Sequence, residues 1–180
     1  RIAEAAGATL DYRPMLLGGV MKATGNAPPG MVPAKGAWMA QDLPRWAAKY
    51  GVPMTFNPHF PVNTLPLMRG AVALLGDDSF APYVEAMFNA MWREPRNMGK
   101  PAEIAGVVSS LGMDADDFAA RIQNPDIKQK LKALTEEAVA RGAFGAPTIF
   151  VGEDMFFGQD RLFMVAEAVG IHISDVVPGY

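Results

Sequence analysis

The sequence contains no cysteine among its 180 residues. These residues can therefore form no disulfide, no cysteine-ligated metal site and no Cys-x-x-Cys redox pair. The absence fits a reducing compartment, and we expect a cytoplasmic protein. The sequence also lacks any run of about 18 apolar residues, the length that a membrane-spanning helix needs. We expect no membrane partner.

Basic charge and histidine are also scarce. The 16 lysine and arginine residues are outnumbered by 19 acidic residues, the net charge is −3, and the basic side chains are scattered along the chain. This distribution produces no field that would hold a nucleic acid, so we expect no nucleic-acid partner. The two histidines, His59 and His172, lie far apart, and no Asp, Glu or His cluster has metal-ligand spacing. We expect no metal.

The chain is rich in apolar residues and in helical patterning. Half of the residues are apolar, which is enough to bury a core in one compact unit with a possible insertion. Apolar spacing and helix-start residues predict helices over 34–50, with a break or kink at Pro44, and over 65–75, 79–92, 101–111, 114–123 and 125–141. Residues 9–17 are expected as a strand, and the glycine- and proline-rich residues 18–33 as a long loop or lid.

Residues 142–161 carry the clearest local signals. Pro147 stands directly before the β-branched and aromatic run Thr148–Val151, and proline is tolerated at the first residue of a strand but not in its middle. Residues 152–154 follow as a turn, 155–157 as a second short strand, and 158–160 as the start of a helix with an acidic first turn. The pattern predicts a β-hairpin that leads into a helix N-terminus.

The bond between Ala146 and Pro147 is a candidate cis peptide. A cis bond would turn the main-chain N–H and C=O of Ala146 outward, where an extended peptide could pair with them. The alternative is a trans proline that ends a loop, which is the commoner state of an X-Pro bond.

Two stretches are similar to one known family. Gly-Ala-Phe-Gly-Ala-Pro-Thr at 142–148 with Phe-Phe-Gly-Gln-Asp-Arg at 156–161, and Leu-Leu-Gly-Gly-Val-Met-Lys-Ala-Thr-Gly-Asn at 16–26, resemble 2-hydroxychromene-2-carboxylate isomerases and kappa-class glutathione transferases. The resemblance implies an α/β, thioredoxin-like fold with a helical insertion domain. Residues 1–37 and 123–180 would form the thioredoxin-like domain and residues 38–122 the insertion. It also implies that the Ala146–Pro147 peptide is cis and faces a cleft shared with Asn26.

The same resemblance implies a glutathione site. Gln159 and Asp160 would open a helix whose N–H groups hold the γ-glutamyl carboxylate, while the Asp160 carboxylate takes the amino group. The implied glutathione contacts are Asn26, Ala146, Pro147, Gln159 and Asp160, with Lys22 and Lys35 as weaker candidates for glutathione or substrate.

Each candidate also has a purely structural interpretation. Asp160 could be an acidic residue that the helix dipole favours in a first turn, and Asn26 could be a turn residue after Gly25. Exposed lysines such as Lys22 and Lys35 are commonly only solvated. Gln159 also departs from the serine or asparagine that the family usually shows at this position.

The function that the resemblance implies is that of a glutathione-dependent isomerase acting on a conjugated aromatic carboxylate, a small molecule. Thiolate addition, rotation about the released bond and elimination would leave glutathione unconsumed. A first strand and a Ser-Pro turn precede this part of the chain in the family. We expect residues before Arg1 that carry this serine, whose hydroxyl would stabilise the thiolate. The resemblance also implies a homodimer.

Three alternatives stay open on the sequence. A kappa-class glutathione transferase would use the same thiolate but keep it attached to an electrophile. A thioredoxin-like binding or chaperone module would have the fold without catalysis. A DsbA-type disulfide oxidoreductase would need two cysteines outside these residues.

Overall fold

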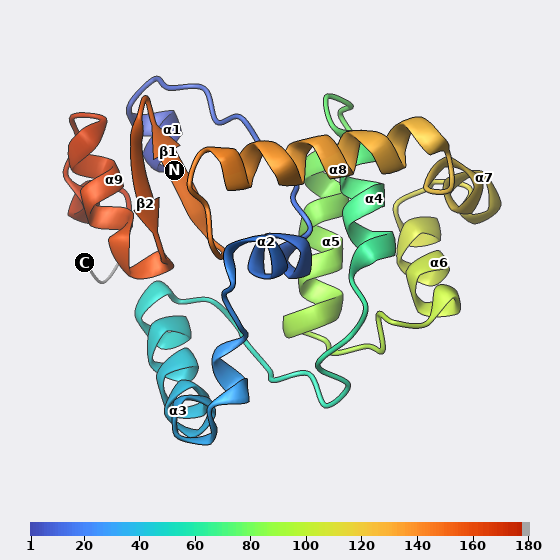
Figure 1. The fold of residues 1–180 in the computed structure, drawn as a ribbon, viewed down its shortest axis with the longest axis horizontal. Helices are drawn as coiled ribbons and strands as arrows, with labels where there is room; N and C mark the ends of the chain where they lie inside the picture. The colour runs from blue at the N-terminus through green and yellow to red at the C-terminus, as the bar shows by residue number, and fades with distance from the viewer. Residues whose placement is uncertain (178–180) are drawn as a thin grey trace. The chain divides into compact units, whose positions relative to one another are not determined.

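The computed structural model describes residues 1–177 (Figure 1). The chain divides into two compact units. The hairpin unit comprises Arg1–Tyr12, Leu17–Val52 and the described residues from Glu136 onward. The helical unit comprises Arg13–Leu16 and Pro53–Thr135. Within residues 1–177, no helix combines the length and the apolar character that crossing a bilayer requires.

The hairpin unit contains the strands of the described chain. Strands β1 (Thr148–Val151) and β2 (Asp154–Phe157) pair antiparallel, with Thr148 opposite Phe157 and Val151 opposite Asp154. The predicted hairpin is therefore confirmed. The other elements of this unit are α1 (Ile2–Ala5), α2 (Leu17–Thr24), η1 (Pro29–Met31), α3 (Pro33–Tyr50), η2 (Gln159–Arg161), α9 (Leu162–Ala168) and η3 (Ile173–Asp175). Helix α9 lies beside the hairpin (Figure 1).

Arg141 supports the turn of the hairpin from the chain segment before it. Its guanidinium lies 3.8 Å from the ring centroid of Phe150 in β1, a cation–π contact. The same group donates a hydrogen bond of 3.3 Å to the carbonyl oxygen of Gly152 in the turn. These contacts support the turn of the hairpin in addition to the main-chain pairing of β1 with β2.

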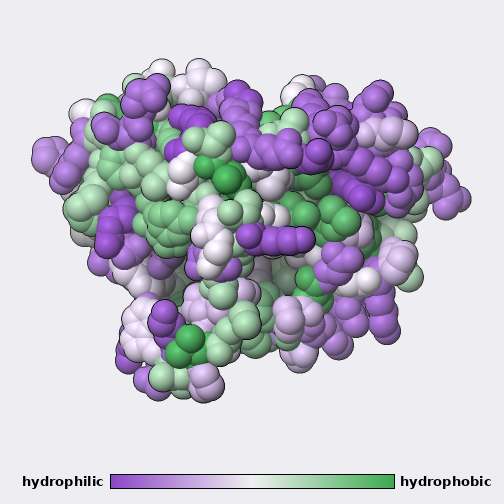
Figure 2. All heavy atoms as spheres, viewed as in Figure 1, coloured by the Kyte–Doolittle hydropathy of each residue, from purple (hydrophilic) through white to green (hydrophobic). Residues whose placement is uncertain are grey.

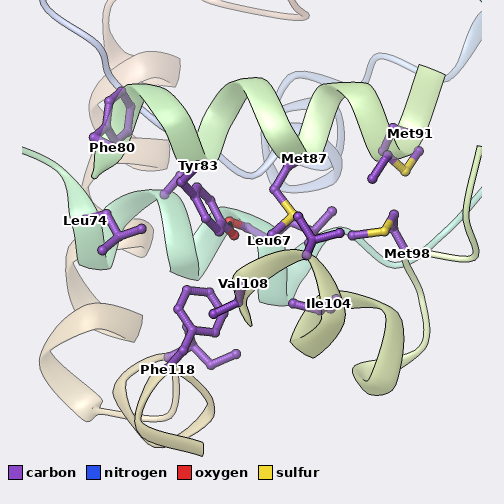
Figure 3. Close-up of a cluster of buried hydrophobic side chains, with 14 residues drawn as sticks. Leu67, Leu74, Phe80, Tyr83, Met87, Met91, Met98, Ile104, Val108 and Phe118 are labelled. Carbon is purple, nitrogen blue, oxygen red and sulfur yellow. Dashed lines mark hydrogen bonds between the residues drawn. The ribbon is translucent and has the colours of Figure 1, made fainter. Parts of the chain in front are cut away.

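The helical unit is built on two clusters of buried apolar side chains. Its helices are α4 (Leu65–Leu74), α5 (Phe80–Trp92), α6 (Pro101–Ser110), α7 (Ala115–Arg121) and the first part of α8 (Pro125–Ala140). Apolar side chains three or four residues apart place one stripe of each helix inward. Figure 3 shows the result, with side chains such as Leu67, Met87 and Val108 converging between the helices.

Tyr83 and Gly70 mark the closest approach in this core. The Tyr83 hydroxyl donates a hydrogen bond of 2.9 Å to the carbonyl oxygen of Leu67, and burial raises the pKa of Tyr83 above its usual value. A Cβ on Gly70 would lie 2.2 Å from the Tyr83 hydroxyl oxygen and 2.6 Å from the Phe118 ring. Glycine at position 70 is therefore what lets α4 meet these two rings.

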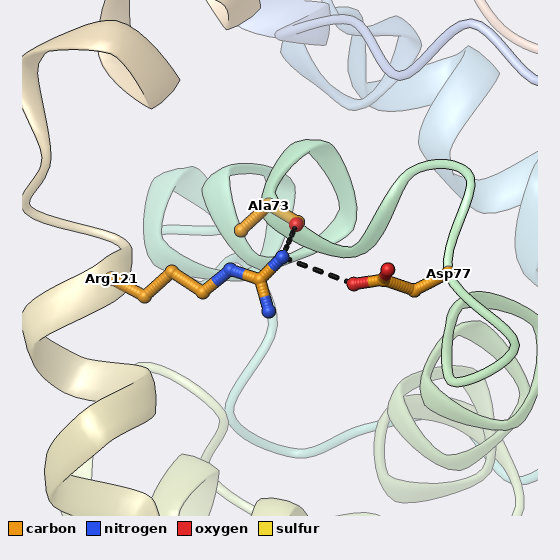
Figure 4. Close-up of polar contacts among 3 residues, drawn as sticks. All are labelled: Ala73, Asp77 and Arg121. Atoms are coloured by element: carbon orange, nitrogen blue, oxygen red, sulfur yellow. Dashed lines mark hydrogen bonds and ion pairs between the residues drawn. The ribbon is translucent and has the colours of Figure 1, made fainter.

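Arg121 joins the end of α7 to the end of α4 (Figure 4). Its Nη2 donates to the carbonyl oxygen of Ala73 in the last turn of α4 and lies 3.0 Å from the Asp77 carboxylate. A cation suits that place because the last carbonyls of a helix lack partners within it.

Several large apolar side chains remain exposed. Figure 2 shows hydrophobic residues interspersed with hydrophilic ones on one face. In the helical unit, the rings of Phe56, Phe60 and Trp92 meet with centroids 5.5 to 6.1 Å apart, and Phe56 and Phe60 are 58% and 50% exposed. The loop between them is held by the fully buried Asn57. Its Nδ2 donates to the carbonyls of Met91 and Arg96, and its Oδ1 accepts from the His59 N–H.

The structure corrects the expectations for residues 9–33. Residues 9–16 have no regular secondary structure, so the predicted strand at 9–17 is wrong, and residues 18–33 contain α2 and η1 rather than only a loop. Apolar alternation without a partner strand leaves Leu10 and Tyr12 exposed. In α2 the two glycines cost about 1 kcal/mol each against helix formation, but complete burial of Val20 contributes about 1.5 to 3 kcal/mol.

The break into two helical pieces, one of the two alternatives expected at Pro44, is also absent. Helix α3 runs unbroken from Pro33 to Tyr50, although an interior proline costs about 3 kcal/mol. The hydrogen bond from the Tyr50 hydroxyl, at the end of α3, to the Gln159 carbonyl oxygen offsets part of this cost. The compact units divide after Val52 and after Thr135, so all of α3 belongs to the hairpin unit and the expected bounds of 38–122 differ from those of the helical unit.

Candidate functional site

The turn Gly158-Gln159-Asp160 is shaped by the glycine. Gly158 has a φ of 101°, a conformation that residues with a Cβ atom strongly disfavour. A Cβ there would lie 2.4 Å from Oδ1 of Asp160. The Asp160 carboxylate therefore folds back over Gly158, and this is possible only because residue 158 has no side chain. The Gly158 N–H also donates to the carbonyl oxygen of Pro147 at 3.0 Å, which joins the turn to the start of β1.

The helix that follows this turn begins as a 3₁₀ turn. η2 covers Gln159–Arg161 and continues directly into α9, so the predicted helix start at Gln159 and Asp160 is confirmed with tighter geometry than an α-helix. Within η2, the Arg161 N–H donates to the Gly158 carbonyl and the Leu162 N–H to the Gln159 carbonyl. The N–H groups of Gln159 and Asp160 are the first of the turn, so no carbonyl inside it can accept from them.

The Asp160 carboxylate already has a cation beside it. Oδ2 of Asp160 lies 2.5 Å from Nη1 of Arg161, and the two side chains are 38% and 46% exposed. An ion pair this exposed contributes only about 0 to 1 kcal/mol, so it is easily rearranged. Arg161, to which the sequence motif assigns no role, is therefore the ionic neighbour of Asp160.

The peptide between Ala146 and Pro147 is cis, as predicted. Both residues are exposed, whereas the preceding Gly145 is buried beneath the Phe157 ring, which would lie 2.7 Å from a Cβ at that position. The Thr148 hydroxyl donates to the Gly145 carbonyl at 2.8 Å. The loop before β1 is thus held on its inner side and exposed at Ala146 and Pro147. The cleft expected beside them stays a prediction.

Asn26 contacts this same loop. Its Nδ2 donates a hydrogen bond of 2.8 Å to the carbonyl oxygen of Phe144, and its Oδ1 accepts one from the Ala27 N–H. A primary amide has a second N–H and a second lone pair, so Asn26 keeps capacity for a ligand. The structure therefore brings together Asn26 and the Pro147 loop, which are 118 residues apart at the bonded positions.

Lys22 and Lys35 are not brought into this group by any contact. Both are exposed, Lys22 in the last turn of α2 and Lys35 in the first turn of α3. Within residues 1–177, neither side chain makes a hydrogen bond or an ion pair. Their role stays a prediction. In the same part of the chain no group of three or more His, Asp or Glu side chains is placed to hold a metal ion.

Tyr50 is a neighbour of the turn that sequence reasoning missed. Its hydroxyl donates a hydrogen bond of 2.7 Å to the carbonyl oxygen of Gln159, 109 residues away. Tyr50 is the last residue of α3, where the helical pattern indicates only an aromatic residue packed on the helix. No local signal in the sequence points to this pairing.

Comparisons with known proteins place this geometry in a family. Residues 1–170 match the family described as DSBA-like thioredoxin domain. A 2-hydroxychromene-2-carboxylate isomerase of Sphingobium xenophagum is 33% identical over 167 residues, which cover 89% of this chain and 83% of the relative. Glutathione S-transferase kappa 1 of Homo sapiens is 31% identical over 179 residues, covering 89% of this chain and 77% of the relative.

A comparison with solved structures also finds a 2-hydroxychromene-2-carboxylate isomerase. That structure has a TM-score of 0.84 to this chain at 31% identity and covers 94% of this chain and 83% of the other. The chain belongs to the DsbA-like thioredoxin family. The expected thioredoxin-like fold and the resemblance to the isomerases and kappa transferases are confirmed, and the relatives named here are enzymes, as expected for this chain.

Proposed function

We propose that this protein is a glutathione-dependent isomerase of the 2-hydroxychromene-2-carboxylate type, acting on a small aromatic carboxylate. The observation that carries the proposal is the turn Gly158-Gln159-Asp160, which is bonded to Pro147 and combines the first N–H groups of a helical turn with a carboxylate. Relatives named as this isomerase, at 31% to 33% identity, supply the reaction class.

The donor set of the turn fits the zwitterionic end of glutathione. The α-carboxylate of the γ-glutamyl residue needs N–H donors, which the start of η2 offers at Gln159 and Asp160. The α-ammonium group needs an anion, which Asp160 offers once its exposed pair with Arg161 rearranges or is shared. Both requirements are met within two consecutive residues.

The middle of glutathione would contact the loop before β1. Ala146, exposed beside the cis peptide, has a main-chain N–H and C=O that suit an extended peptide, and Pro147 would lie against the ligand. Asn26, bonded to this loop, would use its remaining amide N–H or lone pair. Lys22 and Lys35 stay weaker candidates for a carboxylate of glutathione or substrate.

The residues described here bind and orient, and the reactive group comes from the ligand. When bound, glutathione supplies a thiolate, the nucleophilic form of a thiol. The homodimer and the cytoplasmic location expected from the sequence stay part of this proposal.

A kappa-class glutathione transferase is the second candidate, because human glutathione S-transferase kappa 1 matches nearly as well as the isomerases. Assays on the natural full-length protein separate the two. Glutathione-dependent isomerisation of 2-hydroxychromene-2-carboxylate, followed by its change in ultraviolet absorbance, supports the isomerase. Consumption of glutathione by an aryl halide without isomerisation supports the transferase. Absence of both activities and of glutathione binding in calorimetry contradicts the proposal and leaves a non-catalytic module.

A further inference from the structure

The Gln159 carbonyl oxygen is the point where a distant helix reaches the candidate glutathione turn. It accepts the Leu162 N–H inside η2 and the Tyr50 hydroxyl from the end of α3, the latter at 2.7 Å. Among the residues that the structure describes, the other hydrogen bonds of this turn are made within residues 147–162. Tyr50 is therefore the contact that ties the turn to a separate element of the hairpin unit.

This carbonyl belongs to the same peptide group as the Asp160 N–H. The peptide group is planar, so a hydroxyl that fixes the direction of the Gln159 C=O also fixes the direction of the Asp160 N–H. A hydrogen bond accepted by the C=O also polarises the peptide and strengthens its N–H as a donor. The Tyr50 hydroxyl thus acts, through one peptide group, on an N–H that the proposed function assigns to the ligand carboxylate.

The structure holds the Tyr50 ring in place for this bond. The Trp46 ring lies one helical turn earlier in α3, with its centroid 5.4 Å from that of Tyr50 and a tilt of 35° between the planes. Lys49 places its ammonium 5.6 Å from the Trp46 ring centroid. Gly51 ends the helix directly after Tyr50 with a φ of 63°. The tyrosine is a fixed donor at a helix end, packed on a second aromatic ring.

We infer that Tyr50 is a positioning residue for glutathione binding, which it promotes by orienting and polarising the Gln159–Asp160 peptide toward the γ-glutamyl carboxylate. The inference rests on the proposed function. It assigns Tyr50 no contact with the ligand. Removing the hydroxyl is expected to weaken glutathione binding while leaving the reacting groups where they are.

The test is Tyr50→Phe in the natural full-length protein, which deletes only the hydroxyl. The dissociation constant for glutathione, measured by calorimetry, is expected to rise by about 3-fold to 10-fold, the loss that one hydrogen bond of about 1 kcal/mol produces. In steady-state kinetics, the KM for glutathione should rise similarly, while kcat at saturating glutathione and the KM for the second substrate stay within about 2-fold of wild type.

Tyr83→Phe is the matched control. The Tyr83 hydroxyl also donates to a main-chain carbonyl, that of Leu67, but lies in the core of the helical unit. The Tyr83→Phe substitution should lower the unfolding temperature without changing the dissociation constant for glutathione. If Tyr50→Phe behaves like Tyr83→Phe while wild type binds glutathione and Asp160→Ala binds it more weakly, Tyr50 is only structural and this inference is overturned. If wild type does not bind glutathione, the proposed function fails, and the role of Tyr50 fails with it.

Discussion

The carboxylate of Asp160 and the guanidinium of Arg161 form an ion pair between adjacent residues, with Oδ2 and Nη1 2.5 Å apart. The pair sits at the first turn of the element that leads into α9, and both side chains are more than a third exposed. A pair in this setting contributes little to folding because water screens it and the side chains lose entropy. The Asp160 carboxylate can therefore exchange the Arg161 guanidinium for the ammonium group of a ligand at little cost in free energy.

Replacing Asp160 should therefore separate binding from stability. In Asp160→Ala the ligand ammonium loses a charge-assisted contact of roughly 1.5 to 3 kcal/mol, and glutathione affinity should fall roughly 10-fold to 150-fold. The affinity of the Asp160→Asn protein should fall less, because the amide keeps a hydrogen-bond acceptor but not the charge. Calorimetric titration measures both, and circular dichroism checks the fold. Unchanged affinity in a folded Asp160→Ala protein would show that Asp160 is only a residue favoured by the helix dipole.

Gly158→Ala should damage the same site through the backbone. The substitution forces alanine to a φ of 101° and places a Cβ 2.4 Å from the Asp160 carboxylate, so the carboxylate has to move. The backbone conformation alone should cost about 1 to 3 kcal/mol of unfolding free energy. Denaturant unfolding and glutathione titration should both show a loss.

Gly170→Ala provides the control for that prediction. Gly170 also has a positive φ, 80°, but a Cβ there meets no atom within 4 Å. The Gly170→Ala protein should lose a comparable amount of unfolding free energy and keep its affinity for glutathione. Equal affinities in the two variants would mean that the position of the Asp160 carboxylate does not matter for binding.

Asn26→Ala should loosen the loop before Pro147. The substitution removes the hydrogen bond to the Phe144 carbonyl and any ligand contact that the amide makes. We expect faster amide hydrogen exchange in residues 143–148 and a fall in glutathione affinity of about 3-fold to 10-fold. Asn63→Ala, which removes an exposed local bond to the Leu65 N–H in the helical unit, should change neither quantity. Exchange rates unaltered by Asn26→Ala would contradict the bracing role of Asn26.

Tyr83 should make stability fall at alkaline pH. Burial raises the pKa of its hydroxyl above the ordinary value of about 10, so the unfolded chain releases this proton at lower pH than the folded one. The stability linked to Tyr83 is fully present below pH about 10 and is lost as the pH rises above it. Other tyrosines and lysines titrate in the same range, so the quantity to measure is the difference between wild type and Tyr83→Phe. That difference should shrink as the pH rises above about 10, and a difference independent of pH would contradict the assignment.

Local rules explain how much of the candidate site was predictable. Pro147 before a β-branched run, a turn directly after Val151 and a glycine before an acidic helix start each follow from backbone sterics and hydrogen bonding over a few residues. The resemblance added the cis state of Pro147 and the identity of the candidate residues, and the structure confirms the first and brings Asn26 to the loop. Local rules could not assign a role to Arg161 or Tyr50. The contact of Arg161 with Asp160 depends on the rotamers of the two side chains, and the contact of Tyr50 with Gln159 depends on the tertiary fold.

The sequence by itself determined the hairpin, the helix start after it and most of the helices of the helical unit, because these depend on residues close together in the chain. Tertiary structure alone decided that α2 forms despite its glycines, that α3 continues through Pro44, and that Asn26 and Tyr50 bond to residues more than 100 positions away. The physical reason is that burial and hydrogen bonds between distant segments contribute as much free energy as local propensity, and a local pattern contains no information about which segments meet.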